Sequence, residues 1–120
     1  MKRRRGKKVR ENPATEPYER VHTDINTPST RATGVKGYKK IITFTDEWSR
    51  STKVYFIKSE KESLACFKLY VEWVLVQKKA RIRELQADGG GVYIEGAFQS
   101  YLQTQGIKFK KTKSIISFLV

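Results

Sequence analysis

Apolar and polar side chains begin to alternate just after Pro17. The alternation predicts a strand over residues 21–26, whose polar face carries His22, Asp24 and Asn26. Residues 28–37 are rich in Gly, Ser, Thr and Pro, which indicates a loop.

Two β-rich runs follow, at residues 38–45 and 52–57, with the polar segment 46–50 between them. This arrangement predicts a hairpin. The unbroken apolar run at 54–57 is typical of a strand that is covered on both faces.

Helical periodicity replaces the alternation after Ser59. Ser59 with Glu62 three residues later is a capping-box pattern, and we expect the helix to run to about Lys79. Apolar residues then recur in steps of three and four, which predicts a face packed on a core formed by Leu64, Phe67, Val71 and Val74.

The remaining chain predicts a strand, a helix and a strand. The strand spans 82–87, the helix spans 95–105 with Gly106 as its stop, and the last strand begins at Ile107. The order βββαβαβ is a meander followed by two helix crossovers, which require parallel pairing and right-handed connections. We therefore expect an α/β fold with a mixed sheet.

Charge is distributed unevenly. The 120 residues contain 25 Lys and Arg against 12 Asp and Glu, a net charge of +13. The segment 1–17 reads as a flexible basic arm, which grips phosphates, acts as a nuclear localisation signal or is simply a solvated terminus; its cations are Lys2, Arg3, Arg4, Arg5, Lys7, Lys8 and Arg10.

Such an excess of positive charge favours a polyanionic partner, with nucleic acid ahead of a membrane surface. Lys78, Lys79 and Arg81 add a second basic cluster before the fourth strand. The longest apolar run, near 70–76, is interrupted by Glu72, so we expect no membrane span. The basic terminus has no apolar segment behind it and does not resemble a secretory signal.

Cysteine and histidine occur once each, as Cys66 and His22. One of each excludes an internal disulfide and a closed Cys/His zinc site within this chain. A Cys–His hydrolase could use the pair, but Cys66 falls within the helical apolar pattern, which favours a buried core thiol.

Two acidic positions could carry chemistry. Asp24 lies in the first strand, and Asp88 follows the fourth strand at its carboxyl end, where open α/β sheets place their sites. Two adjacent carboxylates favour a hard cation such as Mg²⁺, and in a basic chain this indicates phosphodiester chemistry. From spacing alone, an ordinary Asp-Gly turn at Asp88 explains the pattern equally well.

Several motifs, in the right order and spacing, resemble the integrase core of long-terminal-repeat retrotransposons, most nearly the copia-like branch. They are Val21-His22-Thr23-Asp24-Ile25, the run 42–50, Val54-Tyr55-Phe56, Lys58-Ser59 and the run 86–93. The resemblance covers about residues 17–112, so we expect an integrase-core-like domain at 18–112 and a divergent apolar tail at 113–120.

This resemblance implies a ribonuclease-H-like fold with a D,D-35-E site, in which three carboxylates bind two Mg²⁺ or Mn²⁺ ions for strand transfer on DNA. Asp24 would be the first catalytic and metal-binding carboxylate and Asp88 the second. Asp46 matches a family position in the hairpin turn, where we expect hydrogen bonding, and His22 is expected to be structural. DNA, with RNA as an alternative, and a further copy of the chain are the implied partners.

At the family spacing, the third carboxylate would come after Val120, and Glu84 and Glu95 do not occupy its position. We therefore expect a catalytically impaired, truncated core with part of one sheet face exposed. Two alternatives stay open: a non-catalytic basic nucleic-acid-binding module and a pseudogene-like remnant. A nuclear location is the expectation from residues 2–8.

Overall fold

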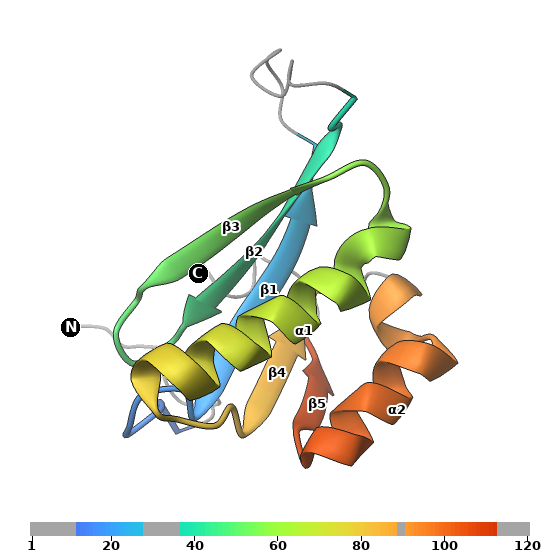
Figure 1. Cartoon of the computed structure of the whole chain (residues 1–120). Coiled ribbons are helices and arrows are strands. Elements are labelled where there is room, and N and C mark those ends of the chain that lie inside the picture. The colour runs from blue at the N-terminus through green and yellow to red at the C-terminus, as the bar shows by residue number, and fades with distance from the viewer. Residues whose placement is uncertain (1–11, 28–36, 89–90, 113–120) are drawn as a thin grey trace, which may run out of the picture.

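The computed structural model describes residues 12–27, 37–88 and 91–112. Within them, five strands form one mixed sheet in the order β3-β2-β1-β4-β5 (Figure 1). The strands are β1 (Arg20–Asn26), β2 (Lys40–Asp46), β3 (Thr52–Ile57), β4 (Glu84–Ala87) and β5 (Lys108–Lys111). The first three strands pair antiparallel, whereas β4 pairs parallel with both β1 and β5. The predicted order βββαβαβ and the mixed sheet are confirmed.

Both long helices cover the same face of the sheet (Figure 1). They are α1 (Ser63–Trp73), which crosses from β3 to β4, and α2 (Gly96–Gln105), which crosses from β4 to β5. Beneath them, alternate residues of the central strands are buried, as at Val21 and Thr23 in β1 and at Ile42 and Phe44 in β2. Residues of opposite parity, including His22 and Asp24, therefore lie on the face that neither helix covers.

Aromatic rings form the middle of the core. The ring of Phe44 stacks on that of Tyr70 in α1, with centroids 4.8 Å apart, and lies 5.6 Å from that of Phe67. Phe67 in turn stacks on Phe98 of α2 at 5.5 Å. Because these four residues are almost completely buried, one continuous aromatic layer joins β2, α1 and α2.

The predicted helix start at Ser59 is a 3₁₀ turn, Glu60–Glu62, and α1 follows it from Ser63. Ser59 Oγ caps this turn by accepting a hydrogen bond from the Lys61 amide, whereas Glu62 accepts from the Lys58 amide and does not close a reciprocal box on Ser59. The helix widens into a π-helical turn at Val74–Lys78, and Lys79 ends it in the left-handed region with φ of 54°. At the end of α2, Gly106 adopts φ of 72° and closes the helix as predicted.

The prediction that the run 54–57 is covered on both faces is wrong. Val54 and Phe56 are 48% and 51% exposed, while Tyr55 is half-buried and Ile57 is buried. The strand lies at the edge of the sheet and faces the helices with only one side. Its apolar residues on the other side are therefore in contact with water.

The segment before β1 contacts the fold. The Ala14 amide donates to Glu47 Oε2, and the Asn12 carbonyl accepts from Arg20. Residues 12–17, assigned to the basic arm by sequence, are thus attached to β1 and to the β2–β3 turn. Residues 1–11, most of the loop at 28–37 and the tail at 113–120 lie outside the described residues.

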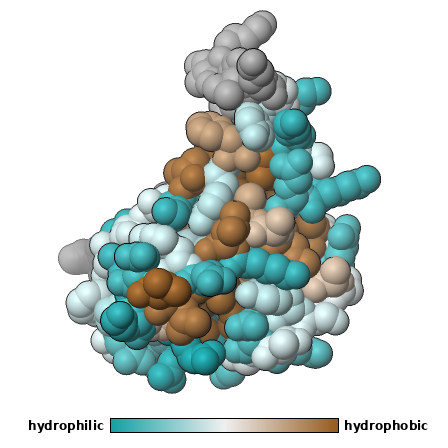
Figure 2. All heavy atoms as spheres, viewed as in Figure 1, coloured by the Kyte–Doolittle hydropathy of each residue, from teal (hydrophilic) through white to brown (hydrophobic). Residues whose placement is uncertain are grey.

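Apolar side chains also reach the outer surface of the helical layer, where Figure 2 shows brown areas among hydrophilic ones. Among the exposed large apolar residues are Leu69 of α1 and, in the turn that follows it, Leu75 and Val76.

Replacing the central ring should destabilise the domain strongly. We expect Phe44→Ala to lower the free energy of unfolding by about 3–5 kcal/mol, because the change removes contacts to three rings, those of Tyr55, Phe67 and Tyr70, and leaves a cavity. Urea unfolding followed by far-UV circular dichroism measures the change. The control Phe56→Ala, at a half-exposed ring, should cost less than about 1 kcal/mol; equal losses would contradict this description of the core.

Candidate active site

The parallel pairing of β1 with β4 brings the two predicted carboxylates to neighbouring positions. Thr23 lies opposite Ala87 in the register, so Asp24 and Asp88 each follow directly after that pair. Both side chains are half-buried, and Asp24 accepts a hydrogen bond of 3.1 Å from the Asn26 amide group. The carboxyl end of β4 thus places Asp88 next to the strand that carries Asp24.

Two contacts secure the backbone around Asp88. The Thr112 amide and hydroxyl both donate to the carbonyl of Ala87, at 2.8 and 3.2 Å. On the other side, the Tyr93 hydroxyl lies 3.0 Å from Thr23 Oγ1, in a buried hydrogen bond. Ala87, directly before Asp88, is therefore held by the residue that follows β5. Thr23, directly before Asp24, is held by the turn that precedes α2.

Burial raises the pKa of Tyr93 far above its usual value. The hydrogen bond to Thr23 acts in the opposite direction, and the charges of Asp24 and Glu60 add to the increase. The phenol consequently stays neutral at physiological pH and serves as a hydrogen-bonding group next to Asp24. Spacing alone does not indicate this role for Tyr93, because an aromatic residue in that position is equally expected of a core.

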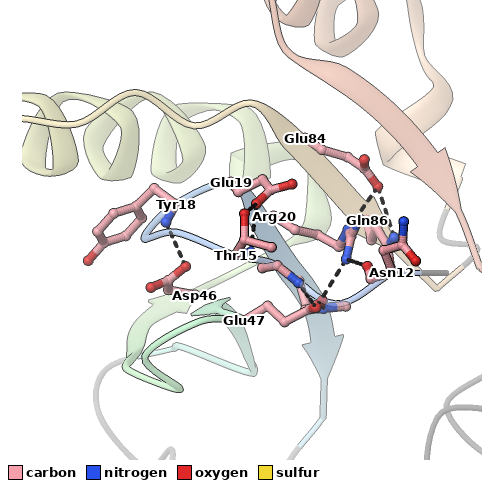
Figure 3. A network of polar contacts seen from close by, with 11 residues as sticks. Asn12, Thr15, Tyr18, Glu19, Arg20, Asp46, Glu47, Glu84 and Gln86 are labelled. Carbon is pink, nitrogen blue, oxygen red and sulfur yellow. Dashed lines mark hydrogen bonds and ion pairs between the residues drawn. The ribbon is translucent and has the colours of Figure 1, made fainter.

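A polar network lies on the uncovered face at the amino end of β1 (Figure 3). Arg20 contacts Glu47 Oε2 at 3.0 Å and Glu84 Oε2 at 3.3 Å, and Gln86 donates to the same Glu84 oxygen at 2.9 Å. His22 Nε2 lies 2.7 Å from Glu47 Oε1. His22 thus has the structural contact expected of it.

Glu47 is the most heavily bonded carboxylate of this network. Burial acts to raise its pKa, but the Ala14 amide, the His22 ring and the positive charge of Arg20 outweigh burial and lower the pKa overall. The ionised form of Glu47 is therefore favoured by folding.

Cys66, the possible Cys–His partner of His22, is buried in α1. This helix packs on one face of the sheet, and His22 lies on the other. Burial, followed by the charge of Glu62, raises the pKa of its thiol. The arrangement supports the core role and not a Cys–His nucleophile.

Asp46 forms the hydrogen bonds predicted at the hairpin turn. Its fully buried carboxylate accepts from the Tyr18 amide at 2.8 Å and from the Ser49 amide at 3.2 Å. It therefore holds the turn against the segment that enters β1, at the opposite end of that strand from Asp24.

Comparisons with known proteins place this geometry in context. A retrovirus-related Pol polyprotein from a Nicotiana tabacum transposon is 28% identical over 92 residues, which are 77% of this chain and 7% of the polyprotein. No family model matches the sequence.

Solved structures share the fold at low sequence identity. The HTLV-2 integrase catalytic core domain in complex with magnesium superposes with a TM-score of 0.64 at 17% identity, over 79% of this chain and 61% of that one. The BIV integrase catalytic core gives 0.61 at 12%, over 80% and 55% of the two chains, and a simian T-cell lymphotropic virus intasome chain gives 0.66 at 16%, over 84% and 34%.

The chain has the fold of an integrase catalytic core. The predicted ribonuclease-H-like α/β class is thereby confirmed, together with the resemblance to a retrotransposon Pol polyprotein. The chain spans only a small part of that polyprotein and about a third to two thirds of the integrase chains that it matches.

The carboxylates of Asp24 and Asp88 are hard oxygen donors, the ligand type that Mg²⁺ prefers. Over residues 12–27, 37–88 and 91–112, no three His, Cys, Asp or Glu side chains gather into a group that could hold a metal ion. Glu84 is engaged by Arg20 and Gln86, and Glu95 is exposed at the start of α2. Among the described residues, neither Glu84 nor Glu95 therefore joins Asp24 and Asp88 as a third carboxylate.

The predicted nucleic-acid contacts divide into two sets. Lys78, Lys79 and Arg81 are exposed at the end of the helical segment that leads to β4. The cations of the arm lie outside the described residues; they are Lys2, Arg3, Arg4, Arg5, Lys7, Lys8 and Arg10. No helix among the described residues is long and apolar enough to cross a membrane.

The ion network makes a prediction for the pH dependence of stability. Because folding lowers the pKa of Glu47 below its usual value of 4.5, its contribution is complete above that value and is lost as the pH falls through the lower folded-state pKa. We expect Glu47→Gln to lower the free energy of unfolding by about 1–3 kcal/mol at pH 7 and by much less at pH 3.

Urea unfolding of both proteins between pH 3 and pH 7 checks this expectation. Glu72→Gln, at an exposed position of α1, serves as the control and should leave the pH dependence unchanged. A Glu47→Gln difference that is constant across this range would contradict a role for the ionised carboxylate.

Proposed function

We propose that this chain is part of an integrase-type, nucleic-acid-binding domain in which Asp24 and Asp88 are two of the carboxylates for metal-dependent phosphodiester strand transfer. The observation that supports the proposal is the register of β1 with β4, in which Asp24 and Asp88 each follow directly after the paired residues Thr23 and Ala87, in an integrase-core fold. The net charge of +13 supports a polyanionic substrate, DNA or alternatively RNA.

Asp24 and Asp88 are the residues that would hold Mg²⁺ or Mn²⁺, and the HTLV-2 core with this fold was solved in complex with magnesium. When bound, such ions activate an attacking oxygen and offset charge on the phosphoryl group. Hydrogen bonds between Tyr93 and Thr23 and from Thr112 to the Ala87 carbonyl hold the residues directly before the two carboxylates.

We further propose that the 120-residue chain, taken alone, is a poor catalyst. Glu95 is the only acidic residue after Asp88 in the sequence, and it caps α2 with exposed side-chain atoms. Two carboxylates hold a cation less tightly than three and leave more phosphoryl charge uncompensated.

A non-catalytic nucleic-acid-binding module is the second candidate function. It is favoured by the exposed cations Lys78, Lys79 and Arg81. They lie at the end of the helical segment before β4 and do not adjoin Asp24. Metal ions separate the two candidates, because a binding module alone requires none.

We propose that this chain self-associates. The HTLV-2 integrase core, which has this fold, occurs in structures described as dimeric and trimeric. Sedimentation velocity tests self-association directly.

We also propose a nuclear location from the basic run at 2–8. Cytosolic accumulation of a fluorescently tagged chain would refute it.

Metal affinity tests the carboxylate pair. We expect Mn²⁺ to bind the chain weakly, and Asp24→Asn and Asp88→Asn each to weaken binding by about tenfold or more, because each removes one negative ligand. Isothermal titration calorimetry with Mn²⁺ measures the loss. Glu72→Gln controls for the general loss of negative charge and should leave Mn²⁺ binding unchanged.

Activity on DNA tests the proposed impairment. With Mn²⁺ or Mg²⁺ we expect the chain alone to bind supercoiled DNA without nicking it. Binding should weaken about 10³–10⁵-fold between 50 and 200 mM salt if some six to ten phosphates are contacted. Nicking that disappears in Asp88→Asn would show that a complete site forms, and salt-independent binding would contradict both candidate functions.

A further inference from the structure

A surface hollow of about 320 Å³ lies at the end of the sheet opposite the carboxylates. Its walls come from three separate segments: Pro17 and Tyr18 before β1, Trp48 and Ser49 in the β2–β3 turn, and Lys78 at the end of the π-helical turn. The turn is adjacent to Val21 at the start of β1, which pairs with Asp46, whereas Asp24 lies three residues further along the strand.

Trp48 is presented to solvent on a firmly held turn. Its side chain is 53% exposed. The backbone on either side is fixed by the buried carboxylate of Asp46 and by the Arg50 amide, which donates to the Asp46 carbonyl at 2.7 Å. The turn therefore presents an exposed, flat indole, on which another ring can stack, from a backbone that is already ordered.

Lys78 supplies positive charge at the edge of the hollow. Its Nζ lies 5.3 Å from the centre of the Trp73 ring, and Lys53 Nζ lies 4.5 Å from the same ring. Of these two lysines, Lys78 lines the hollow, and its cation–π contact with Trp73 limits the positions that its ammonium group takes there.

The acidic residue that lines the hollow, Asp46, is already engaged. Both carboxylate oxygens of Asp46 accept backbone hydrogen bonds, and Glu16 pairs with Arg83 at 3.8 Å. Exposed Lys79 and Arg81 continue the basic surface beyond Lys78. The sequence also joins seven cations of the first ten residues to Asn12, whose carbonyl is bonded to Arg20 at this end of the sheet.

We propose that this hollow binds single-stranded nucleic acid, with an unpaired base stacked on Trp48 and a neighbouring backbone phosphate at Lys78. An exposed aromatic ring beside cations is the arrangement by which proteins bind single strands without reading their sequence. A duplex cannot use it, because its base faces are already stacked inside the helix. The inference rests on the proposed nucleic-acid function, but it assigns a contact separate from Asp24 and Asp88.

Tryptophan fluorescence reports on the stacking directly. Trp48 and Trp73 are the two tryptophans of the chain, so Trp73→Phe leaves Trp48 as the sole indole. We expect twelve-residue oligo(dT) and oligo(U) to quench its emission, and a twelve-base-pair duplex at equal occupancy to leave it nearly unchanged. Comparing the two oligonucleotides distinguishes a DNA strand from an RNA strand. The reciprocal variant Trp48→Phe should show little quenching of Trp73.

Affinity measurements separate the indole from the charge. Trp48→Ala should weaken oligo(dT) binding about 5- to 100-fold and change duplex binding less than about twofold. Lys78→Gln should reduce the salt slope by about one. The matched controls are Leu69→Ala, at a 60% exposed apolar residue, and Lys68→Gln, whose Nζ likewise lies over a ring, 5.2 Å from the centre of Tyr101.

The outcomes distinguish this inference from the proposed function. If the chain binds duplex and single strands with salt sensitivity but Trp48→Ala has no effect, the hollow is not the contact and the proposed function stands. Equal losses for duplex and single strand would also overturn the stacking proposal. If the unaltered chain binds no nucleic acid, both fail. Unchanged urea midpoints for each variant show that a loss of affinity is not a loss of folding.

Discussion

The parallel pairing of β1 with β4 is the interaction on which the rest of this structure depends. It joins the antiparallel meander to the two helical crossovers, and its register sets Thr23 opposite Ala87. The same register aligns Arg20 with Glu84 at the start of the strands, where the two side chains form an ion pair. One backbone arrangement thus determines both the carboxylate pair at one end and the polar network at the other.

The two faces of the sheet differ because both helices pack on one of them. The alternate strand residues that face the helices, such as Phe44, are apolar and pack on the aromatic layer with Phe67 and Phe98. The polar residues at the other alternate positions therefore lie on the uncovered face. On that face, partly buried charged residues from different strands and turns pair with one another. The contacts among Arg20, Glu47 and Glu84 tie the β2–β3 turn to β4.

The two ends of the sheet carry different side chains. Asp24 and Asp88, each directly after a paired residue of β1 and β4, place two acidic groups at one end. At the other end, the turn that Asp46 organises presents Trp48 beside Lys78. The length of β1 separates the acidic pair from this turn.

Sequence patterns predicted most elements because local signals and packing agree there. Alternation, the residues at the ends of α1 and the stop at Gly106 each express a local conformational preference that the tertiary structure retains. The run 54–57 was misjudged, since apolar residues at consecutive positions do not reveal that their strand lies at a sheet edge. The exposed Trp48 carried a usable signal, an aromatic residue inside a polar turn, but the sequence did not indicate its neighbours.

The amino-acid sequence by itself determined the order of elements, the α/β class and the excess of positive charge, and it indicated Asp24 and Asp88 as candidate site residues. Only the tertiary structure decided which residues adjoin them. Tyr93 forms a hydrogen bond with Thr23, and Lys78 lines the same hollow as the turn at Trp48. The residues of each pair are far apart in the chain. Such contacts depend on strand register and helix packing, which are set by the whole core and not by local preference.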